Sequence, residues 1–327
     1  MSAAVSAARL RGVHAATVCP MQDDFSIDEA ALAAHVAQVA AAPGIKGLLI
    51  NGHAGENWLL ERAETRRVVA VVRAAVGPGV FLTAGVNAES SLEAGRRAAD
   101  AEAAGADAVL VFPPNGWGLF QDDGAAARHH GHVAAATTLP ILLYQAPVGA
   151  GRMPYPPALL AELAANPQVI GVKEGSWEVA AFEASRRAVK AVRPDVAVLG
   201  SGDEHLMTSW LIGSEGSQVS LAAVVPETVA ALWAAAQAED WAEARRWHDA
   251  LYPLAAAIYR APPSGRATAR LKACLRLLGR LPRETVRPPL MPLDAAEHAR
   301  LCRALRHAGA SLSDAAGTLT TVGSDVC

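Results

Sequence analysis

Short apolar runs typical of buried β-strands alternate with alanine-rich helical segments over the first 225 residues of this chain. The predicted strands are residues 13–18, 47–51, 80–84, 108–112, 140–144, 169–173, 196–200 and 217–221. The helical patterns between them include 28–42, 61–76, 89–104 and 178–192. The strands are hydrophobic along both faces, which is typical of a parallel sheet covered by helices. Eight such units, with no Gly-x-Gly-x-x-Gly turn after the first strand, favour a closed (β/α)₈ TIM barrel of the α/β class over an open doubly wound sheet.

Strand patterns stop at Pro226, and only helical patterns follow, so the barrel is expected to carry a C-terminal helical extension. The helical patterns cover 229–260, 268–278 and 295–308. We predict a catalytic barrel over 12–225, a helical domain over 226–310 and a tail over 311–327. The tail is rich in Ser, Thr, Gly and Asp and has no periodicity, so we expect it to be mobile. The extension also carries three tryptophans that are expected to be core or subunit-interface residues, namely Trp233, Trp241 and Trp247.

Charge and cysteine content exclude several kinds of partner. The net charge is −3 and the charged residues are spread along the chain, so no basic block is available for nucleic acid or an anionic membrane. No run approaches the length of a membrane span, and residues 1–11 lack the apolar core of a secretory signal. The four cysteines are widely separated and lack metal-ligand spacing. We therefore expect a cytoplasmic protein without disulfides or a metal site.

A lysine ends the sixth predicted strand, in the run Val169-Ile170-Gly171-Val172-Lys173-Glu174. Lysine is among the residues least often buried. Its ordinary pKa is about 10.4, so holding it neutral near pH 7 requires about 4 kcal/mol. Desolvation inside a barrel can supply this and leaves an amine that attacks carbonyl carbon. From this run alone, a lysine that extends from the strand end into solvent is the alternative.

The carboxyl ends of the strands carry the active site in a (β/α)₈ barrel, so residues at these ends are the candidates. Tyr144 ends the fifth strand and Lys173 the sixth, and neighbouring strands lie roughly 5 Å apart. A phenol beside an amine can transfer protons while a carbinolamine becomes an imine. The second strand runs into the loop 51–57, where Gly52 and Gly55 let backbone N–H groups converge on an anion such as a carboxylate.

Other polar residues near strand ends or on helices have simpler interpretations. Glu56 is expected to hold its own loop through backbone N–H groups. Asp203 and Glu204 follow the seventh strand and are expected to be helix N-cap residues. Gln218 lies in the eighth strand and is expected to face the pocket. The histidine pair at 129–130 lies on a helical pattern, where consecutive residues do not share a face, so we expect no metal site there.

Four motifs at the ends of the second, fifth, sixth and seventh strands carry a family resemblance. They are Gly52-His53-Ala54-Gly55-Glu56, Leu143-Tyr144-Gln145-Ala146-Pro147, Gly171-Val172-Lys173-Glu174 and Gly200-Ser201-Gly202-Asp203. In this order they resemble the dihydrodipicolinate synthase/N-acetylneuraminate lyase family of class I Schiff-base aldolases. The resemblance spans about residues 12–309, including an ending that runs from Arg270-Leu271-Lys272 through Val286-Arg287-Pro288-Pro289-Leu290.

The resemblance implies a 2-keto acid that is bound as an imine on Lys173. Tyr144 would be the proton-transfer residue. The loop that contains Gly52, His53 and Ala54 would bind the keto-acid carboxylate. The resemblance further implies that no metal or organic cofactor takes part and that the protein is a homo-oligomer, either a tetramer or a dimer.

This chain departs from the family pattern around the site. The family loop usually has Thr or Ser at the positions of His53 and Ala54, and His53 would either replace one hydroxyl as a proton relay or pack over the pocket mouth. Dihydrodipicolinate synthases carry an arginine for a substrate carboxylate where this chain has Gly149, and Arg152 is three positions away. They also insert a tyrosine from a neighbouring subunit, and the aligned stretch 113–117 contains none. Losing a bidentate carboxylate clamp together with a relay hydroxyl argues against dihydrodipicolinate synthesis.

We therefore expect a Schiff-base-forming lyase that acts on a 2-keto acid. The pattern Tyr144-Gln145-x-Pro147, with no arginine following, is closer to the dehydratases of 2-keto-3-deoxy sugar acids than to the synthases. A pyruvate-dependent aldolase that forms or cleaves a carbon–carbon bond is the alternative. A third alternative is a barrel that binds keto acids without turnover, although a pure binding protein has no need of a desolvated amine.

Overall fold

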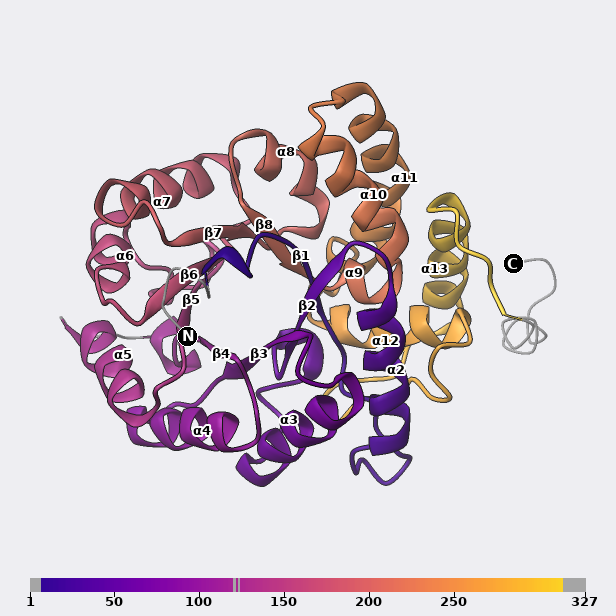
Figure 1. The fold of residues 1–327 in the computed structure, drawn as a ribbon. Coiled ribbons are helices and arrows are strands. Elements are labelled where there is room, and N and C mark those ends of the chain that lie inside the picture. The colour runs from indigo at the N-terminus through magenta and orange to yellow at the C-terminus, as the bar shows by residue number, and fades with distance from the viewer. Residues whose placement is uncertain (1–6, 120–121, 123, 314–327) are drawn as a thin grey trace.

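Eight parallel strands form a closed barrel in the computed structural model, which describes residues 7–119, 122 and 124–313. The strands follow one another around the barrel in chain order, from β1 to β8. Figure 1 shows them as a central ring with helices around it and further helices on one side. The predicted (β/α)₈ barrel with a C-terminal helical extension is confirmed. The predicted mobile tail over 311–327 lies outside the described residues from position 314 onward.

Each predicted strand corresponds to an observed one. The strands are β1 Gly12–Ala16, β2 Ile45–Ile50, β3 Phe81–Val86, β4 Ala108–Val111, β5 Ile141–Gln145, β6 Val169–Glu174, β7 Ala197–Gly200 and β8 Gly216–Val219. The helices among and after them are α2 Glu29–Ala41, α3 Arg62–Val76, α4 Ser91–Ala103, α5 Ala125–Ala136, α6 Pro157–Ala164, α7 Val179–Val192, α8 Leu206–Leu211 and α9 Leu221–Val224. The eighth strand is shorter than predicted, because Ser220 has helical backbone angles and Leu221 begins α9.

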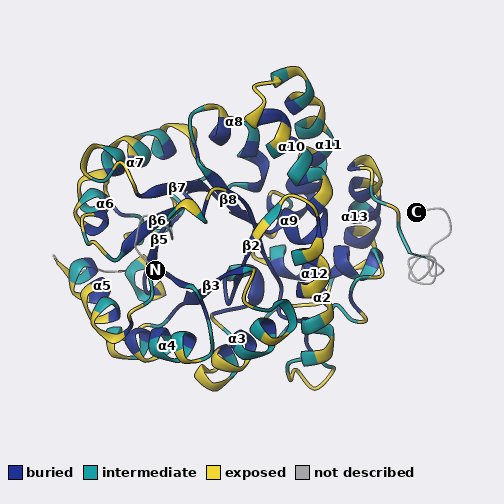
Figure 2. Ribbon diagram, in the orientation of Figure 1, coloured by how far each residue is buried: buried dark blue, intermediate teal, exposed yellow. Residues whose placement is uncertain are grey.

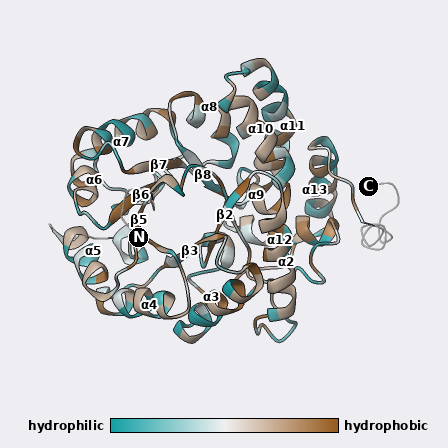
Figure 3. Ribbon diagram, in the orientation of Figure 1, coloured by the Kyte–Doolittle hydropathy of each residue, from teal (hydrophilic) through white to brown (hydrophobic). Residues whose placement is uncertain are grey.

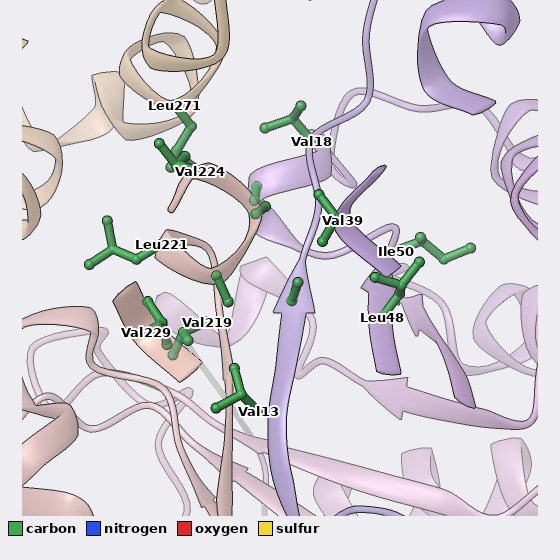
Figure 4. Close-up of a cluster of buried hydrophobic side chains, with 14 of the residues drawn as sticks. Val13, Val18, Val39, Leu48, Ile50, Val219, Leu221, Val224, Val229 and Leu271 are labelled. Carbon is green, nitrogen blue, oxygen red and sulfur yellow. The ribbon is translucent and has the colours of Figure 1, made fainter. Parts of the chain in front are cut away.

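Apolar side chains fill two separate layers. The outer layer lies between the strands and the helices, and Figure 4 shows Val13, Leu48 and Val219 in it. The inner layer lies inside the barrel and includes Leu49, Leu110, Leu142, Tyr144 and Leu199. Figures 2 and 3 show buried, hydrophobic strands surrounded by helices whose outer faces are exposed and hydrophilic. Because both faces of every strand are covered, strand sequences in such a sheet are continuous apolar runs.

The amino-terminal end of the barrel is filled by Leu10 and His14, neither of which is exposed. Glycines in the strands leave the room for them. A Cβ added at Gly47 would lie 2.5 Å from His14 Nδ1, and one at Gly171 would lie 2.8 Å from Leu10 Cδ1. Both distances are shorter than real Cβ contacts, so this end is closely packed.

Within the described residues, four α-helices form the C-terminal extension. They are α10 Pro226–Gln237, α11 Trp241–Tyr259, α12 Ala267–Leu277 and α13 Ala295–His307. The single helix predicted over 229–260 is wrong, because Glu239 has a φ of 57° and the Asp240 side chain caps α11 by accepting the N–H of Glu243. Trp233, Trp241 and Trp247 are partly buried against the core. The predicted domain boundary falls between α9 and α10 and stays a prediction.

Candidate active site

A cavity of about 410 Å³ opens at the carboxyl ends of the strands, within the usual size range of small-molecule sites. Five of the six predicted site residues line it, namely Lys173, Tyr144, His53, Ala54 and Gln218. Gly52 is not among its lining residues. Its carbonyl instead accepts the N–H groups of Gly55, at 3.0 Å, and Asn57, at 3.3 Å. The role that Gly52 has in this structure is therefore to shape the turn rather than to face the cavity.

Lys173 extends from β6 into this cavity. The residue opposite it on β5 is Tyr144, and Lys173 Nζ lies 5.9 Å from the centre of the Tyr144 ring. Among the described residues, no carboxylate lies within ion-pair distance of Nζ. Burial lowers the pKa of Lys173 to about 8, and the negative charge of Asp203 opposes this effect. At pH 7 about one molecule in ten then carries the neutral, nucleophilic amine.

Tyr144 is buried at the end of β5 and packs between two other rings. Its ring centre lies 4.7 Å from that of Phe112 and 5.2 Å from that of His53. Burial, together with the nearby Glu174 carboxyl, raises the pKa of Tyr144 far above its ordinary value. The phenol therefore stays protonated at any physiological pH and can donate a proton or a hydrogen bond beside the lysine amine.

The loop after β2 forms a short 3₁₀ turn, η1 His53–Gly55, at one side of the cavity. The His53 ring lies 4.6 Å from the Phe112 ring and 5.7 Å from the Trp58 ring. Burial and the adjacent Lys173 charge lower the pKa of His53 to about 3. His53 is thus neutral near pH 7 and offers no positive charge to a carboxylate, which leaves the backbone N–H groups of the turn.

Asp203 was predicted to be a helix N-cap, and this prediction is wrong. It begins the 3₁₀ turn η3 Asp203–His205, whose cap residue is Gly202 and which has no side-chain cap. Asp203 Oδ1 accepts the N–H of Leu221 at 2.7 Å, and the carboxyl lines the cavity with Ser220 and Tyr259. Burial raises the pKa of Asp203 to about 7. The carboxyl can therefore exchange a proton near neutral pH, and it lies in the turn that follows β7.

The predicted cap role of Glu204 is wrong as well. Its carboxylate is buried and pairs with Arg260, whose guanidinium lies 5.3 Å from the centre of the Trp177 ring. Trp177 and Tyr259 line the cavity from the α7 side and from the end of α11. Trp177 follows the lysine strand directly, so its place at a strand end was a signal that the sequence analysis missed. Tyr259 belongs to the extension, which reaches the cavity only through tertiary packing, so nothing local in the sequence marks it.

Gln218 extends inward from β8 and is fully buried. Its Nε2 donates to Thr83 Oγ1 at 3.3 Å, and its Oε1 has no hydrogen-bond partner among the described residues. A buried carbonyl oxygen without a donor costs free energy unless a ligand or water donates to it. Gln218 is therefore equipped to accept a hydrogen bond from a bound molecule.

The arginine of the synthases has no equivalent in the cavity. Gly149 is not a lining residue, and neither is Arg152, which is exposed and whose backbone N–H donates to the Trp117 carbonyl at 3.1 Å. Among the described residues that line the cavity, Lys173 is the single Lys or Arg side chain. A second carboxylate on the substrate would therefore meet no fixed cation.

Two other sequence interpretations can be compared with the structure. Glu56 was predicted to hold its loop through backbone N–H groups; it accepts the backbone N–H of Arg287, which lies far along the chain, and it pairs with Lys272. His129 and His130 are buried in α5, where His129 Nδ1 lies 3.0 Å from Ser91 Oγ and His130 Nε2 lies 2.9 Å from Tyr155 Oη. The described residues contain no group of His, Cys, Asp and Glu side chains that could hold a metal ion.

The closed barrel and the cavity around a desolvated lysine define a (β/α)₈-barrel enzyme. The model of the dihydrodipicolinate synthetase family matches residues 9–308. A 4-hydroxy-tetrahydrodipicolinate synthase of Chelativorans sp. (strain BNC1) is 31% identical, covering 91% of this chain and 98% of that protein. An uncharacterized DapA-like lyase of Halobacterium salinarum is 34% identical, covering 89% and 92%.

Solved structures agree with the sequence comparison. YagE of E. coli K12, a prophage protein of the dihydrodipicolinic acid synthase family in complex with pyruvate, superposes with a TM-score of 0.86 at 26% identity. The superposition covers 92% of this chain and 99% of YagE. The chain belongs to the dihydrodipicolinate synthetase family and is a lyase of that family. Within the described ranges, every helix is too short or too polar to cross a membrane.

Proposed function

We propose that this protein is a Schiff-base lyase that acts on a 2-keto acid through Lys173. The observation that carries the proposal is a desolvated amine in register with a protonated phenol, both facing one cavity. The neutral amine attacks the keto carbon, and the carbinolamine loses water to give the imine. Tyr144 supplies and takes back the protons of these two steps.

The η1 turn binds the keto-acid carboxylate in this proposal. Ala54 lines the cavity and offers its backbone N–H, and Gly52 shapes the turn behind it. His53 is an uncharged ring that packs on Phe112 and Trp58, which supports the interpretation that it covers the pocket mouth. Backbone N–H groups alone can bind a carboxylate when the surrounding site excludes water.

The rest of the cavity favours a neutral, hydroxylated substrate tail. Besides Lys173, its polar side chains are uncharged near pH 7, except that Asp203, with its pKa raised to about 7, is about half ionised. They include His53, Asn115, Ser201, Gln218, Ser220 and Thr268. Trp58 and Trp177 add flat apolar walls. This combination supports our expectation of a 2-keto-3-deoxy sugar acid, whose tail carries hydroxyl groups.

Dehydration is the reaction that we propose for this substrate. Loss of a proton from C3 of the imine gives an enamine, whose electrons then expel the hydroxyl on C4 as water. The departing hydroxyl needs a proton, and Asp203, with its pKa raised to about 7, can donate one.

Pyruvate-dependent aldol chemistry is the second candidate. It is favoured by relatives named 4-hydroxy-tetrahydrodipicolinate synthase and by the pyruvate complex of YagE. In that reaction the C4 hydroxyl loses its proton and the C3–C4 bond breaks. The same Lys173 imine would form, so the two reactions differ in their products.

The test is imine trapping followed by product analysis. The purified protein is incubated with pyruvate or with 2-keto-3-deoxy acids, reduced with borohydride and weighed. We expect a mass increase on the peptide that contains Lys173, and a semialdehyde product from a 2-keto-3-deoxy sugar acid. Release of pyruvate instead would select the aldolase, and no mass increase with any keto acid would favour the non-catalytic barrel and refute the lyase.

Dihydrodipicolinate synthesis serves as a separate check. The aldehyde substrate of that reaction carries its own carboxylate, and Gly149 offers no cation to pair with it. Leaving such a charge unpaired costs about 2–5 kcal/mol in a buried site, or roughly 30-fold to several thousand-fold in affinity. We expect a kcat/KM with aspartate semialdehyde and pyruvate below about 10⁴ M⁻¹s⁻¹, the lower end of the usual enzyme range.

We also infer that the protein acts in the cytoplasm as a homo-oligomer. Cys19, Cys274 and Cys302 are buried and form no disulfide among the described residues, which suits a reducing compartment. The oligomer rests on the family resemblance alone. Gel filtration with light scattering would measure it, and a single-chain mass in solution would contradict it.

A further inference from the structure

The family-like ending of the chain has no part in the chemistry proposed above, yet it lies against the site. Helix α12 contributes Thr268 and Leu271 to the cavity. Thr268 Oγ1 also donates to the carbonyl of His53 at 3.3 Å. The C-terminal extension thus contacts the η1 turn directly, from a position more than 200 residues away in the chain.

One turn further along α12, Lys272 forms an ion pair with Glu56, and neither side chain is exposed. Lys272 Nζ also donates to the Thr285 carbonyl at 2.7 Å, and Glu56 Oε2 accepts the N–H of Arg287 at 3.0 Å. Glu56 ends the η1 turn with a φ of 58°, and its own N–H donates to the His53 carbonyl. The pair therefore joins three segments: the turn, the helix and the strap 285–287.

The strap is anchored on the far side of the turn as well. The Arg287 guanidinium donates to the Glu64 carboxylate and to the Leu59 carbonyl, each at 2.7 Å. Water cannot replace either partner of a fully buried ion pair, so such a pair keeps one geometry or is broken at a large cost. The η1 turn is consequently held by α12 and the strap, while Ala54 of the same turn lines the cavity.

We propose that Lys272 and Glu56 are positioning residues that hold the η1 turn in the place where it binds the keto-acid carboxylate. The inference rests on the proposed function, because it assumes that the substrate has this carboxylate. Removing the pair should weaken recognition of the carboxylate without preventing imine formation on Lys173. The two effects can be measured separately with a charged and an uncharged ketone.

The experiment compares pyruvate with its uncharged methyl ester in borohydride trapping. Lys272→Met alone would leave a buried carboxylate without its partner and endanger the fold, so the double variant Lys272→Met/Glu56→Gln is used. For pyruvate we expect the half-saturating concentration to rise at least about tenfold, as for a misplaced charge-assisted hydrogen bond. For methyl pyruvate we expect a change of less than about threefold, because the ester makes no charge-assisted contact with the turn.

The matched control is Lys190→Met/Glu215→Gln, which removes a pair of the same chemistry between α7 and the loop before β8. We expect it to keep the parent's preference for pyruvate. Equal weakening with both ketones, or an equal loss in the control, overturns the inference. A parent protein that traps neither ketone refutes the proposed function itself, whereas trapping with a preference that does not depend on Lys272 refutes only the inference.

A measurement on the parent protein covers the case in which the double variant does not fold. The Arg287 N–H is bonded to Glu56, so its hydrogen exchange reports on the pair directly. We expect saturating pyruvate to slow exchange at 52–57 and at 285–287 together. If exchange slowed at 52–57 alone, binding of the carboxylate would not stabilise residues 285–287, and the inference would be wrong.

Discussion

The two ends of the barrel both bury a basic nitrogen, with opposite consequences. At the amino end, burial lowers the pKa of His14 to about 4. At the carboxyl end, burial lowers the pKa of Lys173 to about 8. Lys173 faces a cavity of about 410 Å³ together with Tyr144 and Asp203. His14 is packed so closely that a Cβ on Gly47 would lie 2.5 Å from its ring.

The difference shows that a lowered pKa by itself marks burial, not function. Both groups lose hydration: His14 is neutral throughout the physiological range, and Lys173 is neutral in about one molecule in ten at pH 7. A reaction needs, in addition, room for a substrate and a second group that can move a proton. The carboxyl end has both features. At the amino end the buried His14 contributes only to packing.

The largest effect should come from removing the amine at the carboxyl end. Lys173→Ala takes away the only covalent catalyst that we propose, so turnover and imine trapping should be lost by at least about 10⁴-fold. Folding should be unaffected, because the change removes a costly buried amine and leaves the β6 backbone intact. Activity assays, trapping and thermal unfolding measure the three quantities.

His14→Ala is the control from the other end. It should lower the midpoint of thermal unfolding, since it opens a void beneath the site, and it should leave trapping on Lys173 within about threefold. The comparison fails if Lys173→Ala retains activity within about tenfold of the parent, or if His14→Ala abolishes trapping.

Removing one hydroxyl should have the next largest effect. Tyr144→Phe keeps the ring packing on Phe112 and His53 but deletes the proposed proton-transfer group. We expect kcat to fall by about 10²–10⁴, as for a lost general acid/base. The KM should change much less, and a change confined to KM would mean that Tyr144 only binds the substrate.

The strands and their order could be predicted because buried parallel strands are continuous apolar runs. That order was enough to place Tyr144 opposite Lys173, which the register of β5 and β6 confirms. Boundaries that depend on single backbone angles were not predictable from the pattern. The break between α10 and α11 depends on the left-handed conformation of Glu239 and on the Asp240 cap.

The site could be predicted only where a residue's place on a strand determines its direction. Lys173, Tyr144 and Gln218 belong to strands, whose alternation decides which side chains face inward. Asp203 follows a strand, and its direction depends on a hydrogen bond from Leu221, which no local pattern contains. Tyr259 reaches the cavity from α11, so only the packed fold brings it there.

The pH dependence should sharpen the difference between the two buried bases. Because the pKa of Lys173 is lowered to about 8, the rate of imine trapping should rise about tenfold per pH unit up to that value and then level off. The negative charge of Asp203 raises this pKa, so Asp203→Asn should move the midpoint to lower pH. His14→Ala should not move it. A midpoint close to the ordinary lysine value would show that Lys173 is solvated.

The smallest effect should come from the amino end of the lysine's own strand. Gly171 precedes Lys173 by two residues and faces the same way, and a Cβ there would lie 2.8 Å from Leu10 Cδ1 and 3.3 Å from Leu142 Cγ. Overpacking of this kind costs about 1–3 kcal/mol, and the Ala substitution returns about 0.4–1 kcal/mol by restricting the unfolded chain. We therefore expect Gly171→Ala to lower the stability by about 1–2 kcal/mol in chemical denaturation.

Its effect on catalysis should be slight, because β6 is bonded to β5 and β7 along its length and these bonds hold Lys173 in place. We expect kcat within about twofold of the parent, since the reacting groups keep their geometry. Leu10 is the side chain that the new Cβ would contact too closely. Shortening it in the double variant Leu10→Val/Gly171→Ala should therefore return part of the lost stability. A large fall in kcat without a matching loss of stability would mean that packing at the amino end of the barrel determines the position of the Lys173 amine. The two ends of the barrel would then have to be treated as one unit.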